Sequence, residues 1–273
     1  MNTLTDGKQA CGYAPVNGLN RYYEIEGTGT PLVYIPPAFA CSGMNSFPAL
    51  VRNHSVITVD LQGHGRTGDI PDRPLTIGQH ASDVVGLLRH LGIAKADFFG
   101  ESYGGAVAVW IALHFPEFAG RIATYGATFG PPQIAVDSKM LQLSTPPTPE
   151  SKSLQFQRNH YKRVAPAPEY WPRIWDKVCS MRWEGFSKDE LVSIQAPVLI
   201  ALGDHDFVRL EHAVETFRRI PGAELAVIPD AGHFALFSEP DKVMPVIAAF
   251  LGKSEASLPI ATGETGYRPG ETR

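Results

Sequence analysis

The chain has 273 residues, of which 44% are hydrophobic and 19% charged, and its formal net charge is −4. This length suits one large domain or two small ones, and the composition is that of a globular protein that buries a core. A mildly acidic chain lacks the basic face that nucleic-acid binding requires, so we expect no nucleic-acid partner.

The cysteines and the N-terminus indicate in which cellular compartment the protein is expected to occur. Cys11, Cys41 and Cys179 include no CxxC pair, so they form neither a disulfide framework nor a metal-binding pattern. We therefore expect a reducing, cytoplasmic compartment. The N-terminal residues lack the apolar segment of a signal peptide, and no apolar run approaches the ~20 residues of a membrane span. Membrane association is not expected.

Apolar runs closed by turn residues predict a series of strands. Residues 1 to about 15 precede them and are interpreted as a loose N-terminal arm. Continuous apolar runs suit strands that are buried on both faces, as in a parallel sheet. The predicted strands cover residues 21–27, 31–37, 55–61, 96–102, 121–127, 197–204 and 224–230.

Helical patterns alternate with these strands. Thr76 and Gln79 have the spacing of a capping box, and Gly92 stands where the helix that they begin should end. The segment 103–115 is apolar nearly all round, which predicts a buried helix. Later helices are predicted over 211–220 and 239–251, and Pro245 inside the last one raises the question of a break. Strands that alternate with helices indicate an α/β fold with a mainly parallel sheet.

One long segment interrupts the alternation. Between Pro131 and about Ile194 there is no apolar run of strand length, prolines cluster, and three of the four tryptophans occur. So many aromatic residues argue against a disordered linker and favour an inserted helical cap. We therefore divide the chain into a core domain, an insertion, the rest of the core and a disordered tail, over residues 1–130, 131–194, 195–252 and 253–273.

The candidate nucleophile lies between a predicted strand and a predicted helix. A G-x-S-x-G pattern is formed by Gly100, Ser102 and Gly104. An apolar predicted strand directly precedes it, and a predicted buried helix directly follows it. This context indicates a nucleophile elbow, a sharp turn that presents the serine hydroxyl. The alternative is an ordinary strand-to-helix turn in which Ser102 caps the helix.

A serine hydroxyl needs a base, and the base needs an acid that orients it. His233 follows the last predicted strand. Asp204 and Asp206 both follow the strand before it, so either could be the acid. The 27 residues from Asp206 to His233 leave room for one helix and one strand, as a right-handed crossover requires.

Together these motifs resemble the α/β-hydrolase superfamily, in its serine esterase and lactonase branch with a helical cap. The resemblance implies an α/β-hydrolase fold, a mainly parallel sheet flanked by helices. It implies Ser102 as nucleophile, His233 as base and Asp206 as acid, because the acid of the family usually stands three residues after the strand-ending glycine. It implies no cofactor and no metal.

The oxyanion hole is the next expected feature. One backbone N–H should come from Tyr103, which follows the nucleophile. The second should come from the loop at residues 36–39, where many family members carry His-Gly and this chain has Pro-Pro-Ala-Phe. Proline has no N–H. Ala38 is therefore the predicted second donor, and Phe39 is the alternative.

The substrate is expected to be a small molecule with an apolar or aromatic group. Aromatic and apolar residues near the predicted site or in the cap are the candidate pocket residues, with the alternative that they only hold the cap on the core. They are Phe39, Trp171, Trp175, Met181, Trp183 and Phe234.

The predicted function is hydrolysis of a carboxylic ester or lactone through an acyl-enzyme. The alternatives are C–C bond hydrolysis or perhydrolysis by the same triad, and a ligand-binding receptor of this fold that barely turns over. Turnover of a substrate panel would separate them. The sequence leaves the oligomeric state open, and a homodimer is one arrangement that it allows.

Overall fold

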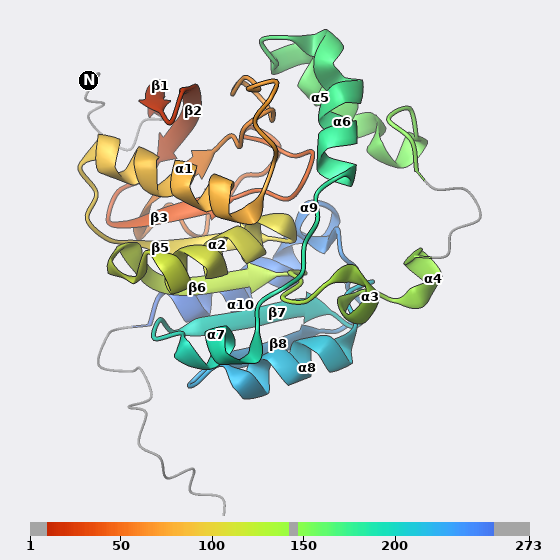
Figure 1. Ribbon diagram of the computed structural model, residues 1–273. Helices are drawn as coiled ribbons and strands as arrows, with labels where there is room; N and C mark the ends of the chain where they lie inside the picture. The colour runs from red at the N-terminus through yellow and green to blue at the C-terminus, as the bar shows by residue number, and fades with distance from the viewer. Residues whose placement is uncertain (1–9, 142–146, 254–273) are drawn as a thin grey trace, which may run out of the picture.

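In the computed structural model, residues 10–141 and 147–253 are described, and they form an eight-stranded sheet in the order β1-β2-β4-β3-β5-β6-β7-β8 (Figure 1). The two pairings of β2 are antiparallel and all the others are parallel. The mainly parallel sheet is therefore confirmed. The strands are β1 (Ala10–Val16), β2 (Leu19–Glu26), β3 (Thr30–Ile35), β4 (His54–Val59), β5 (Ala96–Glu101), β6 (Ala119–Tyr125), β7 (Val198–Gly203) and β8 (Glu224–Ile228).

The prediction of a loose arm over residues 1–15 was wrong for residues 10–15, the part that the structure describes. Residues 10–15 belong to β1, which pairs with β2 along its whole length. Asn17 and Gly18 connect the two strands and both have positive φ, 49° and 81°. An Asn-Gly pair with this backbone forms the tight turn that favours a hairpin. Residues 1–9, and the predicted tail after Lys253, lie outside the described residues.

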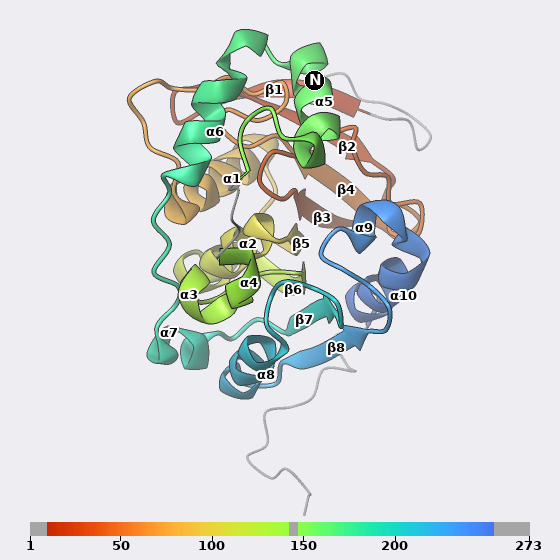
Figure 2. The same cartoon turned by 90° about the vertical axis from the view of Figure 1, so that its right-hand side faces the viewer.

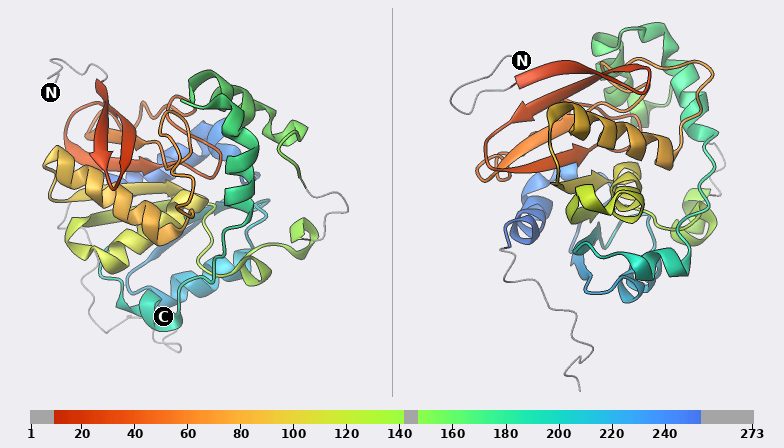
Figure 3. Two further views of the ribbon diagram at one scale, coloured as in Figure 1. Left: turned by 45° about the horizontal axis from the view of Figure 1, so that its top comes forward. Right: turned by 60° about the vertical axis from the view of Figure 1, so that its left-hand side comes forward.

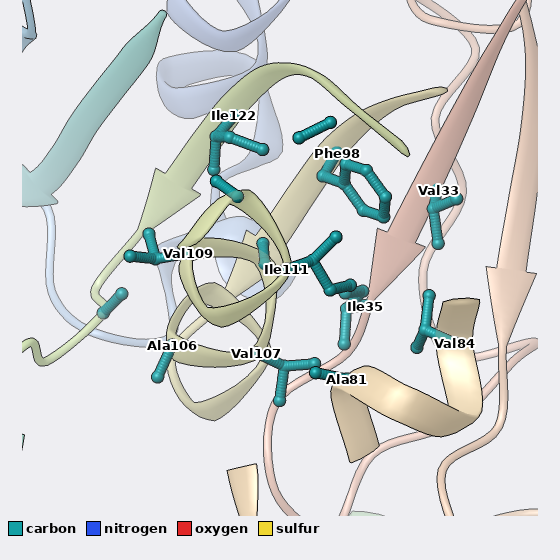
Figure 4. Packing of buried hydrophobic residues seen from close by; sticks show 14 of the residues in the cluster. Val33, Ile35, Ala81, Val84, Phe98, Ala106, Val107, Val109, Ile111 and Ile122 are labelled. Atoms are coloured by element: carbon teal, nitrogen blue, oxygen red, sulfur yellow. The ribbon is translucent and has the colours of Figure 1, made fainter. Parts of the chain in front are cut away.

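Helices cover both faces of the sheet. Figures 3 and 4 show α1 and α2 on one face, and Figure 3 shows α10 on the other. Pro245 lies inside α10 without ending it. The helices of the core are α1 (Ile77–Leu91), α2 (Tyr103–His114), α8 (Leu210–Arg219), α9 (Ala235–Ser238) and α10 (Pro240–Leu251), with a short 3₁₀ helix η1 (Pro116–Phe118).

Successive strand residues supply the two faces alternately. Val33 and Phe98 pack toward α1 and α2, whereas Leu32 and Phe99 pack toward α10. This explains why the strands are continuous apolar runs: both faces of the pleat are covered. Burying such side chains stabilises the fold by roughly 1.5–3 kcal/mol for each large one.

A helical insertion separates β6 from β7. Most of it stands at the end of the sheet toward which the β6 and β7 arrows point and covers the carboxyl ends of these strands, whereas its last helix, just before β7, lies near the start of that strand (Figures 1 and 2). Its elements are α3 (Pro132–Ala135), α4 (Ser138–Leu141), α5 (Gln155–Val164), α6 (Trp171–Cys179) and α7 (Lys188–Ser193), with 3₁₀ helices η2 (Lys152–Leu154) and η3 (Pro168–Tyr170). The described part of the chain holds no helix that is both long and apolar enough to cross a membrane.

One carboxylate of the core anchors this insertion. Asp69 accepts hydrogen bonds from Lys177 Nζ at 2.8 Å and from Gln62 Nε2 at 2.7 Å, and Arg173 Nη2 lies 3.2 Å away. The Asp69 side chain is only 2% exposed, so these contacts are poorly screened by solvent. Because Arg173 and Lys177 both lie on α6, this cluster fixes the helix against the core.

A second buried carboxyl ends β5. Glu101 is 1% exposed, and its Oε2 accepts hydrogen bonds from the Tyr34 hydroxyl at 2.8 Å and from Asn45 Nδ2 at 3.5 Å. Burial raises the pKa of Glu101 to about 8; the two hydrogen bonds oppose this rise, and the Asp206 carboxylate adds to it. A pKa of about 8 favours the neutral form of Glu101 in the folded protein at neutral pH.

The raised pKa of Glu101 should make the fold less stable as the pH rises. An unfolded chain releases the Glu101 proton near pH ~4.3, whereas the folded protein retains it up to about pH 8, so this stability is lost as pH rises between these values. Glu101→Gln retains an acceptor for Tyr34 and should therefore gain free energy of unfolding relative to wild type between pH 5 and pH 8. Urea denaturation at both pH values measures the difference. The exposed control Glu117→Gln should follow wild type, and an identical pH dependence for Glu101→Gln would contradict the prediction.

Candidate active site

Ser102 stands at a strained turn between β5 and α2. Its φ is 50° and its ψ −117°, a conformation that costs an L-residue about 1–3 kcal/mol. A Cβ on Gly100 would lie 2.3 Å from the Gly104 carbonyl oxygen, and one on Gly104 would lie 2.1 Å from the Ile35 carbonyl oxygen. Only glycine fits at these two positions. The Ser102 N–H donates to the Tyr125 carbonyl at 2.8 Å, which holds the turn on the neighbouring strand.

Two loops bring an imidazole and a carboxylate to this hydroxyl. His233, after β8, has its Nε2 3.0 Å from Ser102 Oγ and its Nδ1 2.8 Å from Asp206 Oδ1. An ionised carboxylate can only accept, so Nδ1 carries the proton and Nε2 is left to accept from Ser102. Asp206 is fixed in turn, because its Oδ1 also accepts from the Val208 N–H at 2.9 Å. The structure therefore places these three side chains in one hydrogen-bonded row.

Asp204, the other candidate for the acid, lies in the same loop as Asp206. Asp204 Oδ1 accepts from the backbone N–H of Ala231 at 3.2 Å and does not face the imidazole. Hydrogen bonds from the backbone at Asp230 and Ala231 lower the pKa of Asp204. Asp204 therefore connects the loop after β7 to the loop that carries His233.

The two predicted N–H donors belong to Tyr103, directly after Ser102, and to Ala38, in the loop after β3. Tyr103 is the first residue of α2, where the backbone N–H groups have no partner within the helix. Ala38 follows two prolines in the loop after β3, and the Ala40 N–H donates to the Pro37 carbonyl at 3.2 Å to close a tight turn around it. Phe39 takes φ 66° in this turn. Because Gly104 packs against Ile35 at the end of β3, this loop is held close to the elbow.

The six predicted pocket residues do not form one pocket. Phe39 stacks on Trp175 with ring centroids 5.0 Å apart and lies 5.6 Å from Trp171, so these three join the core to α6. Phe234 neighbours the imidazole and is 57% exposed.

The other two pocket residues lie farther along the insertion. Trp183 packs on Phe186 and Trp110, at 4.9 and 6.4 Å. With Met181 it borders a separate small cavity.

The sequence reasoning missed one contact at the imidazole. The Phe207 ring lies 3.9 Å from the His233 ring, centroid to centroid, at an interplanar angle of 30°. Gly126, with φ 60°, leaves room beneath, since a Cβ there would lie 2.9 Å from His233 Nδ1. The position of Phe207 directly after Asp206 was the available signal. Among the described residues, no three His, Cys, Asp or Glu side chains are grouped to hold a metal ion.

Comparisons with known proteins identify the family of this chain. Residues 27–246 match the model of the Alpha/beta hydrolase family. A Pseudomonas putida protein, the dihydrolipoyllysine-residue acetyltransferase component of an acetoin cleaving system, is 29% identical, over 90% of this chain and 71% of its own. A 2-hydroxy-6-oxononadienedioate/2-hydroxy-6-oxononatrienedioate hydrolase of Paraburkholderia phymatum is 28% identical, over 73% of this chain and 77% of its own.

A solved structure has a similar fold. Est816, an N-acyl homoserine lactone degrading enzyme, superposes with a TM-score of 0.66 at 26% identity, over 86% of this chain and 98% of its own. The region that matches the family model, residues 27–246, contains β3 to β8, the elbow, the insertion and the loops that carry Asp206 and His233. On this evidence the chain belongs to the Alpha/beta hydrolase family.

Proposed function

We propose that the protein is a serine hydrolase that cleaves a carboxylic ester or lactone of a small, largely apolar molecule through an acyl-enzyme. One observation carries the proposal: the Ser102–His233–Asp206 row, with hydrogen-bond distances of 3.0 and 2.8 Å, at a strained elbow. A capping serine would need neither the strain nor the imidazole.

The chemistry follows from the positions of these groups. His233 Nε2 takes the Ser102 proton as Oγ attacks the substrate carbonyl carbon, and Asp206 stabilises the imidazolium that forms. The backbone N–H groups of Tyr103 and Ala38 donate to the developing oxyanion. His233 then protonates the leaving alcohol, the C–O bond breaks, and the acyl group stays on Ser102. Water attacks this ester, with His233 again as base, and releases the acid. No step needs a cofactor or a metal.

The ester or lactone substrate has two supports. Est816, at 26% identity, is an N-acyl homoserine lactone degrading enzyme, and such a molecule contains a lactone carbonyl. In this chain, two aromatic rings, Phe207 and Phe234, lie beside His233 and give the site apolar surface.

C–C bond hydrolysis is the second candidate. It is favoured by the relative of 28% identity that is a hydrolase of 2-hydroxy-6-oxo dienedioates. Both candidates need Ser102 and His233, so a panel of aryl esters, lactones and vinylogous diketones separates them by relative kcat/KM. A preference for the diketone class would favour the second candidate. Labelling of the protein in a single turnover, without release of product, would favour a ligand-binding receptor of this fold.

Ser102→Ala should abolish hydrolysis of the preferred substrate, lowering kcat by several orders of magnitude, because no other group forms the acyl-enzyme. One hydroxyl is lost at a turn whose backbone strain alanine shares, so the melting temperature should change by only a few degrees. Steady-state kinetics and circular dichroism measure the two effects. Ser138→Ala, an exposed hydroxyl deletion in α4, is the matched control. Retention of more than a tenth of wild-type kcat would rule out the assignment.

Asp206→Asn and Asp204→Asn should have different effects. An asparagine at 206 no longer holds the Nδ1–H tautomer of His233, so kcat should fall roughly 10³-fold or more at neutral pH. Asp204 accepts backbone hydrogen bonds from Asp230 and Ala231, so its replacement should lower the melting temperature and leave kcat within a few-fold. Parallel kinetics and thermal denaturation decide. The reverse ranking would make Asp204 the acid.

A further inference from the structure

One aromatic ring lies against the candidate base. The Phe207 ring centroid is 3.9 Å from that of His233, and the two planes are inclined by only 30°, so one ring face lies over the other. Phe234 meets the same imidazole differently, with the ring planes at 90° and the centroids 5.3 Å apart. The His233 side chain is only 8% exposed, and Phe207 therefore supplies part of the surface that replaces water around the imidazole.

The insertion holds Phe207 in this position. The Phe207 carbonyl accepts a hydrogen bond from the Asp137 N–H at 2.8 Å. Next to it, Val136 and Val208 form an antiparallel bridge. A short piece of the insertion after α3 is thus paired with the segment that directly follows Asp206. This pairing holds the backbone of Phe207, and with it the position of the ring over the imidazole.

The contact between the two rings matters most when the imidazole is charged. In the proposed reaction His233 Nε2 takes a proton twice, first from Ser102 and then from the attacking water, and an imidazolium forms each time. The face of a phenyl ring is the negative side of its quadrupole, and it attracts a cation that lies over it. A neutral imidazole gains less from the same face. Because this attraction grows as the proton is transferred, it lowers the barrier and does not merely strengthen ground-state binding.

We infer that Phe207 is a positioning residue of this reaction: its ring keeps the His233 imidazole in place and stabilises the imidazolium that each proton transfer produces. The inference rests on the proposed function, because it takes His233 as the base. Asp206 stabilises the same cation through Nδ1, at the edge of the imidazole, whereas Phe207 acts on its face. An aliphatic side chain of similar size would also exclude water but would offer the cation no negative ring face.

Fluorinated phenylalanines at position 207 test this role. Fluorine atoms draw electron density from the ring face and leave the shape of the ring almost unchanged, so a role in packing alone would not respond to them. The rate constant of acylation, measured from the pre-steady-state release of phenol from an aryl ester, should fall stepwise with one, two and three fluorine atoms. With three it should be about fivefold lower. The ester concentration that gives the half-maximal rate should change less than about twofold, because Phe207 acts on the base and not on the bound ester.

Conventional substitutions and a distant ring provide the controls. Phe207→Leu should lower the acylation rate constant about as much as three fluorine atoms do, and Phe207→Tyr, which restores an aromatic face, should return it to within about twofold of wild type. Phe217, a partly buried residue of α8 that packs on the core, is the matched position, and three fluorine atoms there should leave the rate constant unchanged. An acylation rate constant that does not depend on the number of fluorine atoms at position 207 would overturn the inference.

Binding of phenylboronic acid provides a readout without turnover. Ser102 Oγ forms a bond to boron, its proton passes to His233 Nε2, and the product is a tetrahedral boronate beside an imidazolium. Calorimetry should give a dissociation constant about fivefold higher with the trifluorinated ring at position 207 than for wild type, and an unchanged one for the Phe217 control. This fluorine effect without any hydrolysis of esters would keep the role of Phe207 and refute the proposed reaction. Equal affinities alongside normal Ser102-dependent hydrolysis would refute the role and keep the reaction.

Discussion

The close approach of α2 to the ends of β3 and β5 is the constraint on which the rest of the site depends. Glycine at 100 and 104 lets the backbone turn within van der Waals distance of Ile35, and Ser102 then takes a positive φ at the tip. This places the hydroxyl at the start of a helix, next to the loop that carries Ala38 and below the loops after β7 and β8. The folding free energy of the apolar sheet and helices maintains this local strain.

Much of this arrangement could be predicted from local patterns. Each parallel strand is an apolar run because helices cover both of its faces, and the elbow pattern follows one such run directly. The order of the strands in the chain was enough to predict that the loops of Asp206 and His233 lie close together, since adjacent parallel strands end at the same edge of the sheet. The positions of Asp204 and Asp206 in their loop could not be separated by pattern, because their difference is a backbone contact with Ala231 against a side-chain contact with His233.

Features that depend on contacts distant in sequence were not predictable. The hairpin of β1 was taken for a loose arm because its strand alternates exposed with partly buried residues and has no continuous apolar run, and the Asn17-Gly18 turn was the available signal. The pocket residues share a composition but lie in separate places, since Phe39 packs on Trp175 of α6 whereas Trp183 packs on Trp110 of α2. Asp69, which joins the core to Lys177 across more than one hundred residues, has no local signature at all.

The central claim is that Ser102 carries the acyl group, and trapping that intermediate tests it most directly. An aryl ester mixed with the enzyme and quenched in acid within milliseconds should leave the acyl mass on the peptide that contains Ser102, in an amount that approaches one per chain as deacylation becomes slower than acylation. Phenol should appear in a burst of the same amplitude. Product release at the full rate with no adduct, or an adduct on a different residue, would contradict the account.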